Sequence, residues 1–281
     1  MSQAANLAGA VEGELLPAGR GSRLAARARR LGPALAVFVL ALVAWEAAVV
    51  VFRIEGFLLP RPSVIAVTFV SEFPVIWPAG LFTLREAVGG FALGCVLGIA
   101  IALTTGRWTV VGQAVTPFAI AVNSTPIVAL APIMNNWFGI INPLSKMSIV
   151  AVIVFFPVMI NTLRGLTQVS DEALELMRSY AAGEFPVLFK LRIPNALPFT
   201  FSALKVGSTL SVIGAIVSEY FGGSRQALGV YISQQAALFH FAEAWAAIII
   251  ACLTGVAFYL IILLAERLIM PWHVSLRAQE E

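Results

Sequence analysis

The sequence predicts an all-α membrane protein with six transmembrane helices. Of its 281 residues, 59% are hydrophobic and only 12% are charged, and the mean hydropathy is +0.90. A soluble domain of this length does not have such a composition. An apolar stretch of about 20 residues crosses a bilayer as a helix. Six stretches of this kind are predicted, at residues 32–52, 81–105, 113–133, 145–164, 199–220 and 244–265.

The predicted spans fall within one transmembrane domain, residues 31–270. Residues 1–30 are rich in Ala, Gly and Arg and are predicted to form a disordered cytoplasmic tail, and residues 271–281 a second cytoplasmic tail. With the amino terminus inside, thirteen Lys and Arg residues lie on the cytoplasmic side and five on the outer side, which satisfies the positive-inside rule. We therefore expect a multi-pass plasma-membrane protein with both termini in the cytoplasm. The asymmetry also explains the net charge of +3, which does not imply nucleic acid as a partner.

The segment between the first two spans, residues 56–80, is rich in proline and has a short amphipathic pattern. We expect it to lie on the outer membrane surface. In the first span itself, Glu46 stands in an apolar run without an obvious partner in the sequence.

Two prolines interrupt the third span six residues apart, at Pro126 and Pro132. Irregular backbone at membrane depth is tolerated where it is buried in protein or lines a cavity. Polar residues flank the two prolines, so this stretch is either part of a substrate path or a kinked packing helix. The residues assigned to the path here are Asn123, Ser124, Thr125, Pro126, Asn135 and Asn136.

Two acidic residues near the outer ends of spans also need partners, because ionisable groups in a membrane are costly. Glu219 could contact substrate, receive an extracytoplasmic protein or pair with Arg225, and we assign it with Ser211 of the same span to the path. Glu86 is expected to form an interfacial pair with its neighbour Arg85.

Residues 171–198 form a charged island between apolar spans and are predicted to dock a partner outside the bilayer. Acidic residues at the start of this island favour a helix, and basic residues follow the helix breaker Pro186. Such a helix stays in water and offers Leu174, Leu176 and Met177 to a partner. The alternative is an ordinary solvated loop. The charged residues concerned are Asp171, Glu172, Glu175, Lys190 and Arg192.

The island resembles the EAA loop of permease subunits from binding-protein-dependent ABC importers. Glu175 stands at the acid of that motif, Ala181 at its glycine, and Ile193-Pro194 at its end, whereas Leu176 and Met177 replace its two alanines. The resemblance implies a cytoplasmic coupling helix that docks on a separate ATPase subunit. It assigns ATPase coupling to Glu172, Glu175, Leu176, Met177, Ala181, Ile193 and Pro194.

The sequence Leu59-Pro60-Arg61-Pro62-Ser63 resembles an element of permeases of the nitrate, sulfonate and taurine type, and the similarity extends over residues 35–270. It implies the type I ABC importer permease fold. The expected partners are two ATP-binding subunits, an extracytoplasmic solute-binding protein, membrane lipid and a second permease chain in a homodimer.

The sequence contains no Gly-Lys dipeptide and hence no phosphate-binding P-loop. We expect a transport subunit without enzyme activity or cofactor, with ATP hydrolysed elsewhere. An ion-driven secondary transporter is one alternative, but it predicts internal repeats that the sequence lacks. A membrane scaffold that moves nothing is another.

The substrate prediction depends on the scarcity of cations in the third to fifth spans, where only Lys146 and Lys205 occur. This favours a neutral or weakly charged, partly aromatic solute. The stretch from Arg178 to Gly207 resembles permeases for vitamins and their precursors. Riboflavin is ranked first, a thiamine pyrimidine precursor second, and an alkylsulfonate or nitrate third.

Overall fold

The computed structural model describes residues 20–106, 117 and 127–271, and the regular elements in these ranges are helical. The chain divides into two compact units, residues 1–63 and 64–281, which we treat separately. In the described ranges, five helices are long and apolar enough to cross a membrane; they begin at Gly32, Pro62, Pro143, Glu184 and Phe241. These helices match five of the six predicted spans. Most of the predicted span 113–133 lies outside the described residues.

The first unit contains helix α2, Arg20–Val51, which takes in the last residues of the predicted tail. The carboxylate of Glu46 accepts hydrogen bonds from the backbone nitrogen of Ser63, at 3.1 Å, and from its hydroxyl, at 2.8 Å. Ser63 is the second residue of the next helix, whose first N–H groups have no partner within the helix. Glu46 therefore caps that helix with a negative charge.

Helix α3, Pro62–Thr105, is continuous for 44 residues. The prediction of a separate surface segment was wrong in this respect, since residues 62–80 form the first part of this helix. Pro74 and Pro78 each remove a backbone hydrogen bond, but packing against α11, Phe241–Ile269, holds the segment helical. Gly80 meets Ile250 of α11 there.

The core of the second unit is α6, Pro143–Thr167, which packs against α3 and against α9, Ile193–Glu219. Glycines one turn apart on α3 face α6, and a Cβ on Gly94 would lie 2.6 Å from the carbonyl oxygen of Ala151. Small residues are what allow two membrane helices to approach so closely.

The third predicted span is described only from residue 127 on. A 3-10 turn, η1, covers Ile127–Leu130, and helix α5 covers Ala131–Phe138. Pro132 lies in the first turn of α5, where a proline has no helical hydrogen bond to break.

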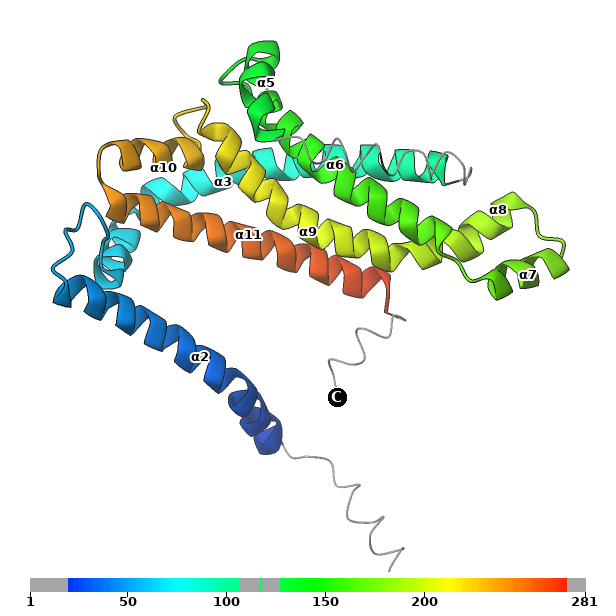
Figure 1. The fold of residues 1–281 in the computed structure, drawn as a ribbon, viewed down its shortest axis with the longest axis horizontal. Helices are drawn as coiled ribbons and strands as arrows, with labels where there is room; N and C mark the ends of the chain where they lie inside the picture. Colours follow the sequence, from blue (N-terminus) through cyan, green and yellow to red (C-terminus); the bar gives the residue numbers. More distant parts are fainter. Residues whose placement is uncertain (1–19, 107–116, 118–126, 272–281) are drawn as a thin grey trace, which may run out of the picture. The chain divides into compact units, whose positions relative to one another are not determined.

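The predicted docking island contains helix α7, Asp171–Ser179, helix α8, Glu184–Val187, and a π turn, η2, Leu188–Arg192, which continues into α9. Helix α10, Leu228–Ala237, follows α9 and precedes α11. Figure 1 shows α7 and α8 at one end of the second unit, with α5 and α10 toward the other end.

Candidate functional site

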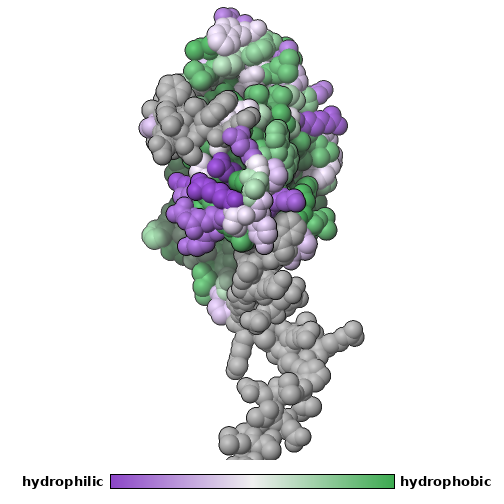
Figure 2. Space-filling model, turned by 90° about the vertical axis from the view of Figure 1, so that its right-hand side faces the viewer, coloured by the Kyte–Doolittle hydropathy of each residue, from purple (hydrophilic) through white to green (hydrophobic). Residues whose placement is uncertain are grey.

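The predicted docking island begins with the short exposed helix α7. The hydroxyl of Ser170 caps it by accepting a hydrogen bond of 3.3 Å from the nitrogen of Ala173. Asp171 and Glu172 occupy the first turn and Arg178 the last turn, the distribution that a helix dipole favours. None of the α7 residues is buried. Figure 2 looks onto this end of the second unit, where hydrophilic side chains gather.

The helix ends in a Schellman cap at Ala181. The nitrogen of Ala181 donates to the Arg178 oxygen at 2.9 Å, and that of Ala182 donates to the Met177 oxygen at 3.0 Å. Ala181 has a φ of 49°, a left-handed conformation that favours glycine because it has no Cβ. This conformation explains, within the chain, why the position takes a small residue. Pro186, predicted to break the docking helix, instead lies in the first turn of α8.

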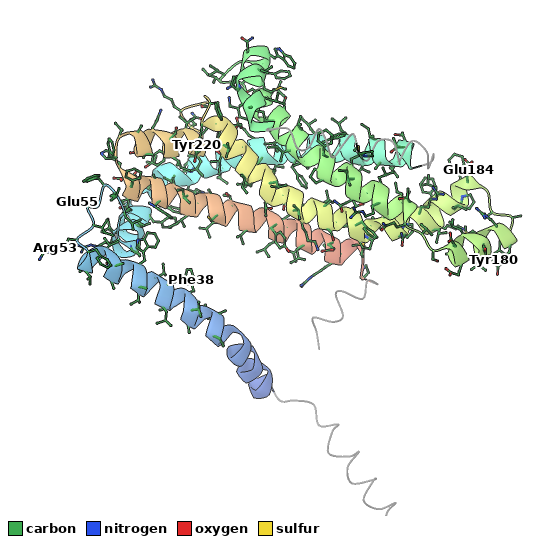
Figure 3. All side chains as sticks on the ribbon, in the orientation of Figure 1. Phe38, Arg53, Glu55, Tyr180, Glu184 and Tyr220 are labelled. Atoms are coloured by element: carbon green, nitrogen blue, oxygen red, sulfur yellow. The ribbon has the colours of Figure 1, made fainter. Side chains whose placement is uncertain are left out.

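The other residues that the sequence predicts to couple to an ATPase lie at the surface of this end. Glu172, Glu175 and Leu176 are exposed, and Met177 is half-buried. Beside them is a cavity of about 240 Å³, lined by Leu174, Arg178, Phe185, Val187, Leu188 and Arg192. The island thus combines exposed acids with a hollow between α7 and α8, which is lined by apolar side chains and by the charged residues Arg178, Glu184 and Arg192. Figure 3 places Tyr180 and Glu184 at this end of the chain.

Ile193 and Pro194 begin α9 directly after the π turn. The nitrogen of Ile193 donates to the Leu188 oxygen, five residues back. Pro194 has no N–H for the ordinary bond to the preceding turn, which explains why the π turn occurs here. The island therefore continues into a membrane-spanning helix without a break.

The far end of the island is joined to the end of α6, which precedes the island. The side-chain amide of Asn195 donates to the carbonyl oxygens of Gly165, at 2.8 Å, and Gln168, at 3.0 Å. A Cβ on Gly165 would lie 2.6 Å from the Cα of Ala196, so α6 and α9 touch along their backbones. A displacement of the island must move both helices together.

The residues predicted for the substrate path are spread over the opposite half of the fold. Asn123, Ser124, Thr125 and Pro126 lie outside the described residues. Asn136 is exposed on α5. Ser211 is buried, and its hydroxyl donates to the Ser208 oxygen of its own helix at 2.7 Å, which is a packing role in this arrangement.

Glu219 lies at a junction of three helices. One carboxylate oxygen accepts the hydroxyl of Thr83 on α3 at 2.7 Å, and the other accepts the nitrogen of Gly229 on α10 at 2.6 Å. The nitrogen of Leu228 donates to the Thr83 hydroxyl at 2.9 Å. The first two N–H groups of α10 are thus satisfied by α3 and α9. Glu219 therefore bonds to Thr83 and Gly229, whereas Arg225 is exposed.

Lys146 lies beside this junction and is 1% exposed. Its ammonium donates to the side-chain oxygens of Asn135, at 2.9 Å, and Ser145, at 3.0 Å, and to the carbonyl oxygen of Ile140. The side-chain amide of Asn135 donates in turn to the Phe221 oxygen at 3.2 Å. All three N–H bonds of the ammonium are therefore used within the protein.

The expected pair of Glu86 with Arg85 was wrong. Glu86 is 3% exposed and faces Glu219 and Lys146, whereas Arg85 is exposed. Adjacent residues on a helix point about 100° apart, so the two side chains leave α3 in different directions. Thr83 and Glu86, three residues apart on one face, were the available signal for this junction.

A multi-span helical protein that presents a capped, charged helix outside its apolar spans has the organisation of a membrane subunit with a docking segment. Residues 94–272 match the family described as "Binding-protein-dependent transport system inner membrane component". The chain belongs to this family, and its fold is that of a type I ABC importer permease. The resemblance seen in the sequence is thereby confirmed.

Two relatives have the same level of identity. The riboflavin transport system permease protein RibX of Chloroflexus aurantiacus is 31% identical over 239 residues, 84% of this chain and 88% of that protein. The formylaminopyrimidine transport permease protein ThiX of Halalkalibacterium halodurans is 31% identical over 240 residues, 84% of this chain and 94% of that protein. A crystal structure of an amino acid ABC transporter with histidines is similar in fold, with a TM-score of 0.56 and 20% identity. The match covers 72% of this chain and 97% of the transporter chain.

Proposed function

We propose that the chain forms the translocation path of an importer for a small neutral, partly aromatic solute, with riboflavin the first candidate. Two copies of the chain pair as a homodimer. Two ATP-binding subunits dock on the island of residues 171–198, and an extracytoplasmic solute-binding protein delivers the substrate to the other face. The exposed, capped helix α7 at one end of the permease fold is the observation that carries this proposal.

The island is the cytoplasmic end in this proposal, and both chain termini are cytoplasmic. The positive-inside rule supports the orientation. ATP binding closes the ATPases and draws the two α7 helices together, and the path opens outward. Hydrolysis and release return the path to the inward-facing state. Glu175 is the anchor to the ATPase, and Ala181 marks the closest approach.

The contacts around the island support a rigid transfer of this movement. Asn195 joins α6 to α9, and Arg192 reaches the end of α3. The displacement of α7 therefore reaches three membrane helices at once. The same proposal includes the division of the chain into a transmembrane domain, residues 31–270, and two cytoplasmic tails, residues 1–30 and 271–281.

The path is assigned to the third span and its surroundings. Residues 123–126 and Asn136 are the proposed contacts with the solute, since Asn136 is exposed on α5. Asn135, Ser211 and Glu219 frame the path, because their polar groups are engaged within the fold.

Charge supports a neutral solute. Lys146 donates all three of its hydrogen bonds to groups of the protein. Lys205 forms an ion pair of 2.7 Å with Glu266. Neither ammonium is free to hold an anion in this arrangement. The similarity to RibX and ThiX favours riboflavin or a thiamine pyrimidine precursor, with an alkylsulfonate or nitrate as the remaining candidates.

The test is uptake by proteoliposomes that contain the chain, its copurified ATPase and its binding protein. We expect ATP-dependent uptake of labelled riboflavin, competed by unlabelled riboflavin and not by nitrate or an alkylsulfonate. Competition by a formylated pyrimidine alone would move the proposal to the thiamine precursor. Transport without ATP would overturn the importer mechanism.

The docking assignment is tested with a matched pair of exposed acids. We expect Glu175→Ala to reduce both ATPase association and uptake, and Glu55→Ala, in the loop after α2, to leave both unchanged. Full uptake by the Glu175 variant would remove this residue from the docking surface.

A further inference from the structure

Two carboxyl groups and one ammonium are buried at the junction of α3, α6 and α9. Glu86, Lys146 and Glu219 are 3%, 1% and 1% exposed. Burying a charge is costly unless it is paired and hydrogen-bonded. With all three groups ionised, the junction would hold one uncompensated negative charge.

The surroundings of Glu219 favour the ionised form of its carboxyl group. Both of its oxygens accept donors, from the Thr83 hydroxyl and the Gly229 nitrogen. It also lies at the amino-terminal end of α10, where the helix dipole stabilises a negative charge. The fit is tight, since a Cβ on Gly229 would lie 2.6 Å from the Glu219 carboxylate.

Glu86 is in the opposite situation. Its Oε2 atom has no hydrogen-bond partner among the described residues. The Lys146 ammonium donates its three hydrogen bonds to Asn135, Ile140 and Ser145. Glu86 faces the Glu219 carboxyl group of α9. A hydrogen bond between two carboxyl groups requires that one of them carries a proton. An ionised Glu86 would leave a charged oxygen in the interior without a donor.

We propose that Glu86 is a proton-binding site, occupied at neutral pH, whose proton bonds α3 to α9 through Glu219 and so fixes the start of α10. The junction then contains one cation, one anion and one neutral acid. The proposal concerns the chain itself and does not depend on the transported solute or on the ATPase.

The other groups around Glu86 are consistent with a protonated Glu86. Lys146 faces it from α6 and Glu219 from α9; Tyr220 follows Glu219, and α10 presents the N–H groups of Leu228 and Gly229. Tyr231 of α10 donates instead to Glu72. If Glu86 lost its proton, two carboxylates would face each other in the interior, where like charges repel strongly. The packed junction therefore weakens as the pH rises.

The same substitution at the two acids gives opposite expectations. In Glu86→Gln the amide keeps a donor for Glu219 and carries no charge, so the fold and the protection of the Gly229 amide from hydrogen exchange should stay within about twofold of wild type. In Glu219→Gln an amide group must face the Gly229 nitrogen or the Thr83 hydroxyl. We expect this variant to exchange the Gly229 amide roughly tenfold faster.

Infrared spectroscopy observes the proton directly. At pH 7 the wild-type protein should show the carbonyl band of one protonated carboxyl group, which Glu86→Gln removes and the control Glu72→Gln keeps. As the pH is raised until this band disappears, the Gly229 amide should lose protection in wild type and keep it in Glu86→Gln.

Three results would overturn the proposal. A wild-type spectrum without a protonated carboxyl band at pH 7 does so without any variant, even if the Gln proteins fail to fold. A band that survives in folded Glu86→Gln does so as well. If Glu219→Gln is tolerated and Glu86→Gln is not, the proton belongs to Glu219.

Discussion

The guanidinium of Arg192 donates a hydrogen bond of 2.9 Å to the carbonyl oxygen of Gly106. Arg192 is the last residue of the π turn that precedes α9, and Gly106 follows the end of α3. The bond satisfies a carbonyl that has no partner within α3, and it places a positive charge at the negative end of that helix. The bond is a direct link between the predicted docking island and the helix that carries Glu86.

Arg192→Ala should weaken this link by about 1–2 kcal/mol, the value of a hydrogen bond to a charged group at a partly buried site. We expect the ATPase to remain bound and uptake per ATP hydrolysed to fall several-fold. The measurement is uptake and ATP hydrolysis in the same proteoliposomes. Lys190→Ala is the control, since Lys190 is an exposed cation in the same turn. Equal losses in both variants would point to a general effect of surface charge.

Ala181→Gly should stabilise the end of α7. Glycine adopts the observed φ of 49° without a Cβ, so the local opening free energy should rise by about 1 kcal/mol. Hydrogen exchange at the Ala182 amide, which closes the cap, should slow by about fivefold. Ala181→Val should have the opposite effect, because a β-branched residue is poorly tolerated there. Faster exchange in the glycine variant would contradict this account of the cap.

Gly165→Ala should destabilise the contact between α6 and α9. The new methyl group would meet the backbone of Ala196 and the ring of Phe199, at 2.6 and 2.9 Å, and overpacking of this kind costs about 1–3 kcal/mol. The midpoint of thermal unfolding in detergent should fall. Gly255→Ala on α11 is the matched control, because a Cβ there meets nothing within 4 Å. An unchanged midpoint in Gly165→Ala would show that the two helices can move apart at little cost.

Removing one partner of the ion pair between Lys205 and Glu266 should destabilise the fold more than replacing both partners. The two side chains are 21% and 9% exposed. Lys205→Met leaves a carboxylate without its cation, and because Lys205 is partly exposed we expect a cost of about 3 kcal/mol, the lower end of the range for buried pairs. The double variant with Glu266→Gln should recover most of that loss. Thermal unfolding of both variants measures this, and additive losses would exclude coupling between the two residues.

The hydrogen bond of Tyr231 leads us to expect a loss of stability at alkaline pH. Its hydroxyl donates to Glu72 at 3.1 Å, and burial, followed by the charge of Glu72, raises the pKa of Tyr231. Because the folded protein holds the proton more tightly than the unfolded chain, this contribution is complete below about pH 10 and is lost as the pH rises further. The unfolding midpoint of wild type should therefore fall more steeply above that pH than the midpoint of Tyr231→Phe. The change Tyr180→Phe, at an exposed position, should keep the wild-type slope.

The described membrane spans and the helix α7 could be predicted because each depends on residues close together in the sequence. An apolar run, or a serine followed by acids, carries its own structural information. The continuity of α3 could not be predicted, because Pro74 and Pro78 normally indicate a break. Burial of this segment against α11 outweighs the two lost hydrogen bonds.

The polar junction could not be predicted for a related reason. Thr83 and Glu219 bond across 136 residues of sequence, and no local pattern specifies that distance. Glu86 was assigned to its sequence neighbour Arg85, although the partner that matters is on another helix. The capping role of Glu46 was missed in the same way, because Ser63 lies beyond a turn whose path the sequence does not specify.

The continuity of α8, η2 and α9 gives the protein a lever. The run Glu184–Glu219 has 36 residues, which at 1.5 Å per residue is about 54 Å, well beyond the roughly 30 Å of hydrocarbon in a bilayer. One arm therefore extends outside the membrane, on the side where we propose that the ATPase docks, and the other ends at Glu219. A tilt of only about 5° over such a length moves the far end by about 5 Å, roughly the rise of one helical turn. In the proposed importer, small movements of the ATPase subunits would in this way become openings several ångströms wide at the other end of the helix.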